Sequence, residues 1–179
     1  MALTATIYTI EIDLADSDRG VYESLALRVA RHPSESEEYL VTRLLAYALE
    51  YDEGIEFSRG ISDPEEPTIS IRDLTGQLKV WVEIGNPDPS RVHKASKASP
   101  RVKIYTHKDP KQLVDRLAGE RIHRAEDIEV WAVDRAFIAQ VAQRLDRRMS
   151  FSLSVTDREL LLSIGSETLS GRLVRHPLV

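Results

Sequence analysis

The chain opens with two stretches in which apolar and polar residues alternate. Residues 3–14 place Ile10 and Ile12 on one face with more polar residues between them, as expected of a half-buried strand. A second alternating run covers residues 22–30, and the turn-forming cluster at 16–20 separates the two. This pattern predicts an antiparallel hairpin.

The next segment changes to helical spacing. Leu40 and Leu44 belong to an apolar stripe that continues to Glu50, which predicts a helix packed on a sheet. Ser34 is the expected N-cap of this helix, because Glu37 follows it by the three residues of a capping box.

Strands and helices then alternate through the middle of the chain. We predict strands at 55–57, 69–74, 78–84, 102–105 and 128–133, and helices at 89–99 and 110–119. Asp109 is the expected cap of the second of these helices, with Pro110 at its first position. The strand–helix–strand–helix–strand order from Leu78 to Val133 is typical of parallel βαβ units.

The C-terminal part is predicted to be a helix followed by antiparallel strands. The helix covers residues 134–145, and three short strands follow at 151–156, 159–164 and 167–174. The prediction is therefore an α/β (mixed α+β) fold in which antiparallel hairpins at both ends flank a βαβ segment. No linker divides the sequence, so residues 1–179 are predicted to form one domain.

Composition and charge narrow the classes of function. The 179 residues include no cysteine, which excludes disulfides, cysteine-ligated zinc and cysteine nucleophiles. The net charge of −5 gives no overall attraction to nucleic acid, so such binding would need a local basic patch. No membrane span or signal peptide is evident, and we expect a cytoplasmic protein without an evident small-molecule cofactor.

Glu83 is the most informative single residue. It follows the apolar residues of a predicted buried strand, at the carboxyl end where ligands bind in α/β sheets. The alternative interpretation is a buried ion pair that only stabilises the fold, because an unpaired buried carboxylate is costly. Arg43 lies on the apolar side of the first helix and is a candidate partner for Glu83.

Basic residues follow Glu83 on the next predicted helix. Lys94 has Arg91 and Lys97 three residues before and after it, and Arg101 and Lys103 come soon afterwards. They form either a solvated surface or a local cationic patch that contacts phosphates.

Spaced motifs between Ala30 and Tyr105 resemble those of the YaeQ family of small bacterial proteins. They are RHPSESEE, TRLLAYAL, EEP, DLTG, WVEIGNPD and KAS, in that order. This family is regarded as a variant of the PD-(D/E)XK nuclease-like superfamily, so the resemblance implies a restriction-endonuclease-like core and a role that involves nucleic acid.

The resemblance implies a set of site residues. In that superfamily an acid on the first helix, an Asp and a Glu on two strands, and a lysine two residues further hold Mg²⁺ and orient water. Here Glu35 or Glu38 and Glu83 match the acids. However, Thr68 stands at the Asp position and Gly85 at the lysine position.

Three other side chains are candidates for the missing groups. Lys94 is the candidate ammonium, and Asp63 or Asp73 is the candidate carboxylate. The implied catalytic residues are Glu83 and Lys94, the implied Mg²⁺ ligands are Glu83, Glu35 and Glu38, and the implied substrate-binding residues are Arg31, Arg43, Thr68, Arg91 and Lys97. We therefore expect a nuclease site that is impaired or inactive. The alternative hypothesis is a non-catalytic module that binds a protein partner, for instance in the transcription machinery.

Overall fold

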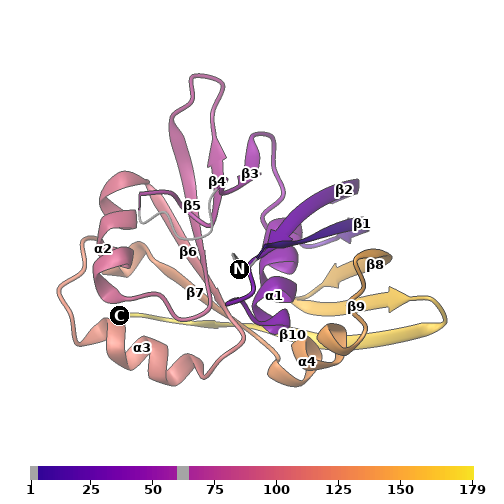
Figure 1. Cartoon of the computed structure of the whole chain (residues 1–179). Coiled ribbons are helices and arrows are strands. Elements are labelled where there is room, and N and C mark those ends of the chain that lie inside the picture. The colour runs from indigo at the N-terminus through magenta and orange to yellow at the C-terminus, as the bar shows by residue number, and fades with distance from the viewer. Residues whose placement is uncertain (1–3, 60–64) are drawn as a thin grey trace. The chain divides into compact units, whose positions relative to one another are not determined.

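The computed structural model describes residues 4–59 and 65–179, and it has a mixed α+β architecture. The chain forms two compact units. The first contains residues 4–49 and 133–173, and the second contains residues 50–132 and 174–179, apart from 60–64. Each unit has one mixed sheet and two of the four α-helices found in the described residues (Figure 1). The single domain expected from the sequence stays a prediction.

The sheet of the first unit has the strand order β2-β1-β8-β9-β10. The strands are β1 (Thr6–Asp16), β2 (Val21–Arg31), β8 (Arg148–Thr156), β9 (Glu159–Ile164) and β10 (Glu167–His176), the last of which ends in the second unit. The antiparallel β1–β2 and β8–β9–β10 pairings confirm both predicted hairpin regions. Sequence patterns did not predict that β1 and β8 pair in parallel.

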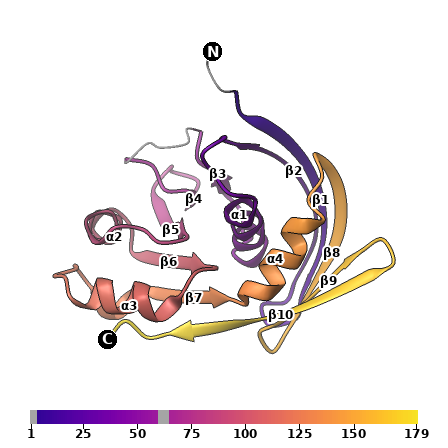
Figure 2. The ribbon, with the colours of Figure 1, turned by 60° about the horizontal axis from the view of Figure 1, so that its bottom comes forward.

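Two helices, α1 (Glu37–Leu49) and α4 (Arg135–Gln143), lie side by side on the concave face of this sheet (Figure 2). The alternation in β1 puts Ile10 and Ile12 on the buried face. Packing is tight at the end of the sheet. A Cβ atom added to Gly171 would overlap the ring of the buried Phe137.

Helix α1 starts two residues later than a Ser34 cap requires. The hydroxyl of Ser36 accepts a hydrogen bond from the backbone N–H of Tyr39 (3.0 Å), which is the geometry of an N-cap. The hydroxyl of Ser34 instead lies 2.6 Å from Nδ1 of His32. The predicted capping box from Ser34 to Glu37 is therefore wrong, because a second serine nearer to the helix satisfies its first N–H groups.

The sheet of the second unit has the order β3-β4-β5-β6-β7. The strands are β3 (Ile55–Phe57), β4 (Ile69–Arg72), β5 (Leu78–Ile84), β6 (Arg101–Thr106) and β7 (Glu129–Val133), whose last residue belongs to the first unit. Strands β3, β4 and β5 pair in an antiparallel manner, whereas β5, β6 and β7 are parallel. The predicted βαβ segment is therefore confirmed.

Helices α2 (Pro89–Ala98) and α3 (Pro110–Ala118) cross over between these parallel strands. Their buried residues Val92 and Leu113 join Trp81, Ile104 and Val130 of the strands in one apolar core. The side chain of Asp109 accepts a hydrogen bond from the backbone N–H of Lys111 (3.0 Å), which confirms the predicted cap of α3. A short 3₁₀ helix, Ala125–Asp127, precedes β7 and was not predicted.

None of the helices in the described residues is long and apolar enough to cross a membrane.

Candidate functional site around Glu83

Glu83 is the penultimate residue of β5, and its side chain is almost completely buried, with only 3% of the residue exposed. Trp81 precedes it by two residues, so the period of a strand puts both side chains on the same face. Trp81 belongs to the apolar core formed with α2 and α3. Glu83 is therefore a carboxylate on the helix-covered face of the sheet.

Both carboxylate oxygens of Glu83 accept hydrogen bonds from groups in its own unit. The indole Nε1 of Trp81 donates to Oε1 at 2.7 Å, and Nε of Arg91 lies 2.9 Å from Oε2. The guanidinium of Arg91 is also 5.8 Å from the centre of the Trp81 ring, within the range of a cation–π contact. These contacts supply the partners that a buried carboxylate needs.

The observed ion-pair partner of Glu83 is thus Arg91 on α2, eight residues further along the chain. Arg43 lies in the first unit, where its Nη2 donates to the backbone oxygen of Ala30 (2.7 Å). Pairing between Arg43 and Glu83 stays a prediction. The alternative interpretation of Glu83, an ion pair that stabilises the fold, is thus supported: the ion pair attaches α2 to β5.

The basic residues of α2 either contact the segment that precedes β4 or are exposed to solvent. Nη2 of Arg91 donates to the backbone oxygen of Glu66 (2.7 Å), and the ammonium of Lys94 forms an ion pair with Glu65. Lys97 is exposed and has no ion-pair partner among the described residues. The predicted basic face is therefore partly neutralised within the second unit.

Thr68 and Glu83 lie opposite each other, Thr68 directly before β4 and Glu83 on the adjacent strand β5. Ile69 pairs with Val82 in the antiparallel β4–β5 ladder, so the same register puts Thr68 opposite Glu83. Thr68 is buried, and its backbone oxygen accepts a hydrogen bond from Ser58 (3.0 Å). The two positions that the resemblance equates with a pair of acids are adjacent, but one carries a hydroxyl.

Asp73, one of the two candidates for the missing carboxylate, does not lie beside Glu83. Asp73 follows β4 at the hairpin turn, and its side chain accepts hydrogen bonds from Thr75 and Gln77. The hydrogen bond from the Thr75 hydroxyl, together with the backbone N–H of Gln77, lowers the pKa of this exposed carboxyl. Asp73 is thus a turn residue at the end of β4 far from Thr68, whereas Asp63 lies outside the described residues.

Glu35 and Glu38 belong to the first unit and do not share a helical face. Glu35 precedes α1, and its Oε1 accepts a hydrogen bond from the backbone N–H of His32 (3.0 Å). Its backbone oxygen accepts from Nη1 of Arg31 (2.8 Å). Glu38 lies in the first turn of α1. The Ser34 cap would have placed Glu35 in the first turn of this helix, but the cap at Ser36 leaves it outside.

The environment of Glu83 does not fit a magnesium site. Across residues 4–59 and 65–179, no three His, Asp or Glu side chains gather closely enough to hold a metal ion. Mg²⁺ prefers several oxygen ligands, whereas Glu83 meets an indole N–H and a guanidinium. A ligand set that combines Glu83 with Glu35 or Glu38 stays a prediction.

Sequence analysis missed a second polar cluster in this unit. Both carboxylate oxygens of Glu50 accept hydrogen bonds from Nζ of Lys103 (3.0 and 2.9 Å), and the Tyr105 hydroxyl donates to Oε1 at 2.5 Å. Glu50 is only 6% exposed. Lys103 is therefore a partly buried ion-pair residue, with 13% of its side chain exposed, and not part of a surface patch. The sequence did contain a signal for this cluster: Lys103 lies two residues before Tyr105 in an apolar strand, so both side chains are on one face of the sheet.

Comparisons with known proteins agree on one family. The model of the YaeQ protein family matches residues 1–173. Proteins described as "Uncharacterized protein YaeQ" from Salmonella typhi and Escherichia coli K12 are 33% and 32% identical over 164 residues, which is 91% of this chain and of each relative.

Solved structures give the same result. The crystal structure of YaeQ protein from Xanthomonas axonopodis pv. citri matches with a TM-score of 0.87 and 31% identity, covering 97% of this chain and 99% of the other. That of YaeQ protein from Pseudomonas syringae also gives a TM-score of 0.87, at 28% identity, covering 96% and 95%. The resemblance of the spaced motifs is thus confirmed, and the chain belongs to the YaeQ family.

Proposed function

We propose that this protein has a PD-(D/E)XK-like, restriction-endonuclease-like core and binds nucleic acid without metal-dependent hydrolysis. The arrangement of β4, β5, α2 and β6 supports the first part. The β4–β5 register puts Thr68 beside Glu83, the two positions that correspond to the Asp and Glu of that superfamily. Helix α2 then follows β5 and leads into the parallel strand β6.

The contact between Glu83 and Arg91 is the observation that carries the non-hydrolytic part. Nε of Arg91 lies 2.9 Å from the carboxylate, so a divalent cation at Glu83 would have to displace a positive charge or lie next to one. Thr68 offers a neutral hydroxyl, which is a weaker ligand for Mg²⁺ than a carboxylate. Gly85 has no side chain to orient a water molecule.

The nucleic-acid part is supported by the cations that remain available near the start of β6. Lys97 is exposed, and Arg101 is exposed with only a long contact of 3.9 Å to Glu129. Lys94 pairs with a glutamate that is itself largely exposed. Because exposed ion pairs contribute only about 0–1 kcal/mol, a backbone phosphate can replace Glu65 at Lys94 at little cost. Such contacts would bind a phosphate backbone without reading its sequence.

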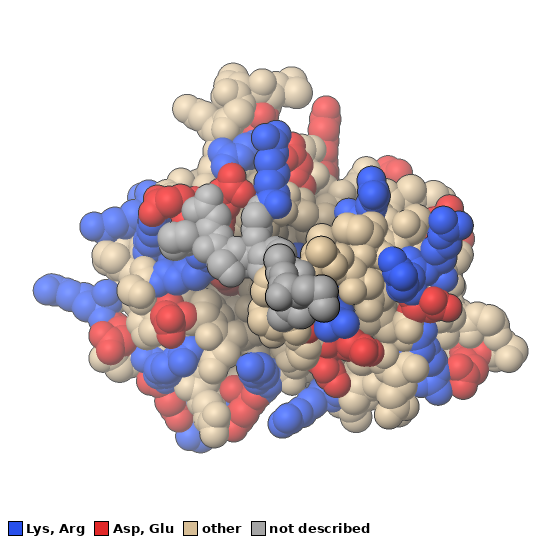
Figure 3. Space-filling view, viewed as in Figure 1, with Lys and Arg blue, Asp and Glu red and all other residues tan. Residues whose placement is uncertain are grey.

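A protein partner is the second candidate function, and the charge distribution over α2 and α3 favours it. Lys and Arg side chains are interspersed with Asp and Glu on the face shown in Figure 3. The net charge of the chain is −5. A mixed surface of this kind suits a partner with complementary charges of both signs, whereas binding to nucleic acid strengthens with the number of phosphates that the surface neutralises.

Oligonucleotide binding at two salt concentrations separates these functions. We would measure fluorescence anisotropy of labelled single- and double-stranded DNA and RNA at about 50 and 200 mM salt. Lys94→Ala/Lys97→Ala is expected to weaken binding and to reduce the salt slope by about one to two, since each phosphate contact contributes roughly 0.7–0.9. Lys111→Ala is the matched control, an exposed lysine on α3 with its own carboxylate partner.

The outcomes are distinct. If no oligonucleotide binds even at the lower salt concentration, nucleic-acid binding is wrong and the protein-partner function is favoured. Incubation of the same oligonucleotides with millimolar Mg²⁺ or Mn²⁺ tests the second part. Cleavage that depends on the metal and disappears in Glu83→Ala would overturn the non-hydrolytic proposal.

A further inference from the structure

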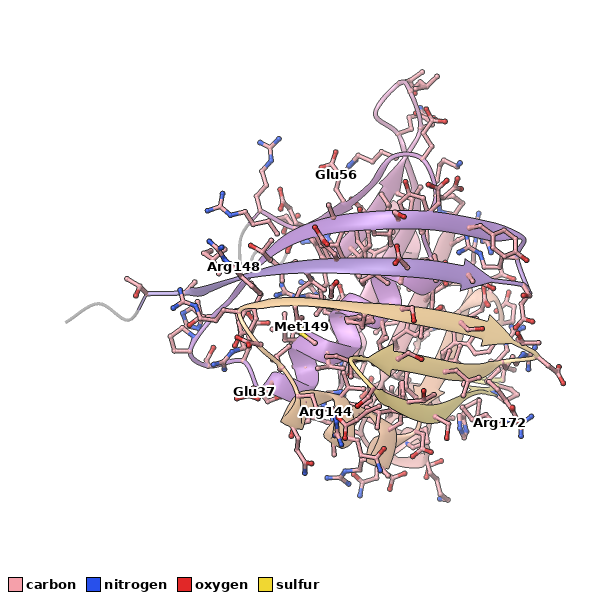
Figure 4. The ribbon with its side chains drawn as sticks, turned by 90° about the vertical axis from the view of Figure 1, so that its right-hand side faces the viewer. Glu37, Glu56, Arg144, Arg148, Met149 and Arg172 are labelled. Carbon is pink, nitrogen blue, oxygen red and sulfur yellow. The ribbon has the colours of Figure 1, made fainter. Side chains whose placement is uncertain are left out.

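The exposed face of the first unit's sheet carries a pocket that the site around Glu83 does not include. Its volume is about 700 Å³, within the range of small-molecule sites. The pocket is lined by Ile7, Thr9, Arg28, Asp146, Arg147 and Arg148. Figure 4 looks onto this face and shows Arg148 at the start of β8.

Strand pairing brings the basic residues together from distant parts of the sequence. Thr9 in β1 lies opposite Arg28 in the antiparallel β2 and opposite Arg148 in the parallel β8. Neighbouring strands are about 4.7–4.9 Å apart, so the two arginines flank Thr9 at roughly 10 Å from one another. Two arginine side chains on this spacing can reach a single ligand between them.

The charges in this pocket are not balanced by the protein. Three arginines and one aspartate give a formal charge of +2 in a chain of net charge −5. Oδ1 of Asp146 accepts a hydrogen bond from the backbone N–H of Arg147 (2.7 Å). None of the three arginine side chains forms an ion pair with a described residue.

The lack of ion pairs does not result from a lack of nearby acids. Glu11 is two residues along β1 from Thr9 and is exposed on the same face of the sheet. Glu11 forms no ion pair with a described residue, so it leaves the three arginines open to a ligand, although its charge offsets part of theirs. The residues that line the pocket keep a net positive charge, which attracts anions.

We propose that this pocket binds a phosphate group. Guanidinium groups bind phosphate through two parallel N–H···O hydrogen bonds, and a phosphate dianion matches the formal charge of +2. The hydroxyl of Thr9 provides a further donor between the two arginines. Ile7 provides an apolar wall for the rest of a phosphate-bearing ligand. This site is in the first unit, and it does not depend on the nucleic-acid binding proposed for α2.

Calorimetry with inorganic pyrophosphate, in a buffer without phosphate, tests the site directly. Saturable binding is expected for the wild type. The exposed double variant Arg28→Gln/Arg148→Gln is expected to bind at least tenfold more weakly. Arg172→Gln is the matched control, because Arg172 is an exposed arginine of the same sheet that does not line the pocket, and it should bind as the wild type does.

A second variant separates charge from hydrogen-bond geometry. Arg28→Lys/Arg148→Lys keeps the charge but loses the paired hydrogen bonds, so an intermediate affinity is expected. Absence of saturable binding to the wild type, or equal binding by the glutamine variant with its circular dichroism unchanged, would overturn the proposal.

Competition then identifies the source of the phosphate. A labelled single-stranded oligonucleotide that pyrophosphate displaces, and that the glutamine variant no longer binds, would place the phosphate in a nucleic-acid backbone. Binding of pyrophosphate without any binding of the oligonucleotide at these arginines would identify a small phosphate-bearing ligand. Both results support the phosphate site, and neither depends on Lys94 or Lys97.

Discussion

Replacing Glu83 decides between a structural acid and a poised metal ligand. Glu83→Gln keeps the shape of the side chain but removes its charge. If the amide oxygen remains bonded to the indole of Trp81, the amide NH₂ faces the N–H group of Arg91. Two donors then meet where an ion pair with a separation of 2.9 Å stood.

The expected loss follows from the burial of both partners. Removing one member of a buried ion pair costs about 3–5 kcal/mol, and a hydrogen bond to a charged group contributes about 1.5–3 kcal/mol. The side chain of Arg91 is 25% exposed and has a second acceptor in the backbone oxygen of Glu66, which softens the penalty. We therefore expect Glu83→Gln to lower the free energy of unfolding by about 2–3 kcal/mol.

Glu83→Ala should cost more, because it also leaves the buried indole N–H of Trp81 without an acceptor. An unsatisfied buried donor costs about 1–3 kcal/mol, so the expected total is about 3–5 kcal/mol. For a chain of this length each kcal/mol shifts the Tm by roughly 2–4 °C. Glu83→Gln is therefore expected to lower the Tm by about 4–12 °C.

Urea unfolding followed by tryptophan fluorescence, with a double-mutant cycle, measures this contribution. Comparing Glu83→Gln and Arg91→Met with the double variant gives the coupling energy, which is expected to be about 1–3 kcal/mol. Millimolar Mg²⁺ should leave the Tm of the wild type unchanged, because a ligand stabilises a protein only when it binds the folded state.

Two results would refute this reasoning. A Glu83→Gln variant as stable as the wild type, or more stable, would indicate an acid held under strain for function, as at many active sites. A Tm that rises with Mg²⁺ in the wild type but not in Glu83→Gln would identify Glu83 as a metal ligand.

Three further predictions concern packing, a buried ion pair and pH. Gly171→Ala should destabilise the protein by about 1–3 kcal/mol, as measured by urea unfolding, because the added Cβ would overlap the ring of Phe137. Lys103→Ala should cost about 3–5 kcal/mol in the same assay, because Glu50 would keep its buried charge without the ammonium. Burial raises the pKa of Asp16 above 3.8, so the folded state binds the proton more tightly than the unfolded state does. The stability of the wild type relative to Asp16→Asn is therefore expected to be highest below 3.8 and to fall as pH rises through the raised pKa.

Matched controls make these three outcomes interpretable. Ser170→Ala changes the residue next to Gly171 without adding a Cβ atom and should have a small effect. Lys111→Ala removes an exposed lysine paired with Asp115, so a loss comparable to that of Lys103→Ala would contradict the argument from burial. A stability difference for Asp16→Asn that does not change with pH would contradict the raised pKa.

Local sequence patterns were sufficient for most individual elements. The two alternating runs near the N-terminus form the β1–β2 hairpin, since strand period and a turn are encoded within about 25 residues. Asp109 and Pro110 predicted the start of α3, because capping depends on a few adjacent residues. The parallel β5–β6–β7 segment followed from the alternation of strands and helices.

Side-chain partners were less predictable than the elements. The sequence indicated that Glu83 needs a partner, but an apolar strand and several downstream arginines do not specify which one. Arg91 is the partner because α2 folds back over the face of β5 that carries Trp81 and Glu83. In the same way, the cap at Ser36 removed Glu35 from the helix to which the sequence assigned it.

The sequence alone thus determined the family and most of the strands and helices. It also pointed to the central stretch from Pro67 to Lys94, where the buried carboxylate of Glu83 needs a partner. Tertiary structure alone decided what each charged group meets. The parallel pairing of β1 with β8 joins segments more than 130 residues apart, and it brings Arg148 to the side of Thr9 opposite Arg28. Hydrophobic periodicity specifies which face of a strand is buried, but it carries no information about which other strand will lie beside it.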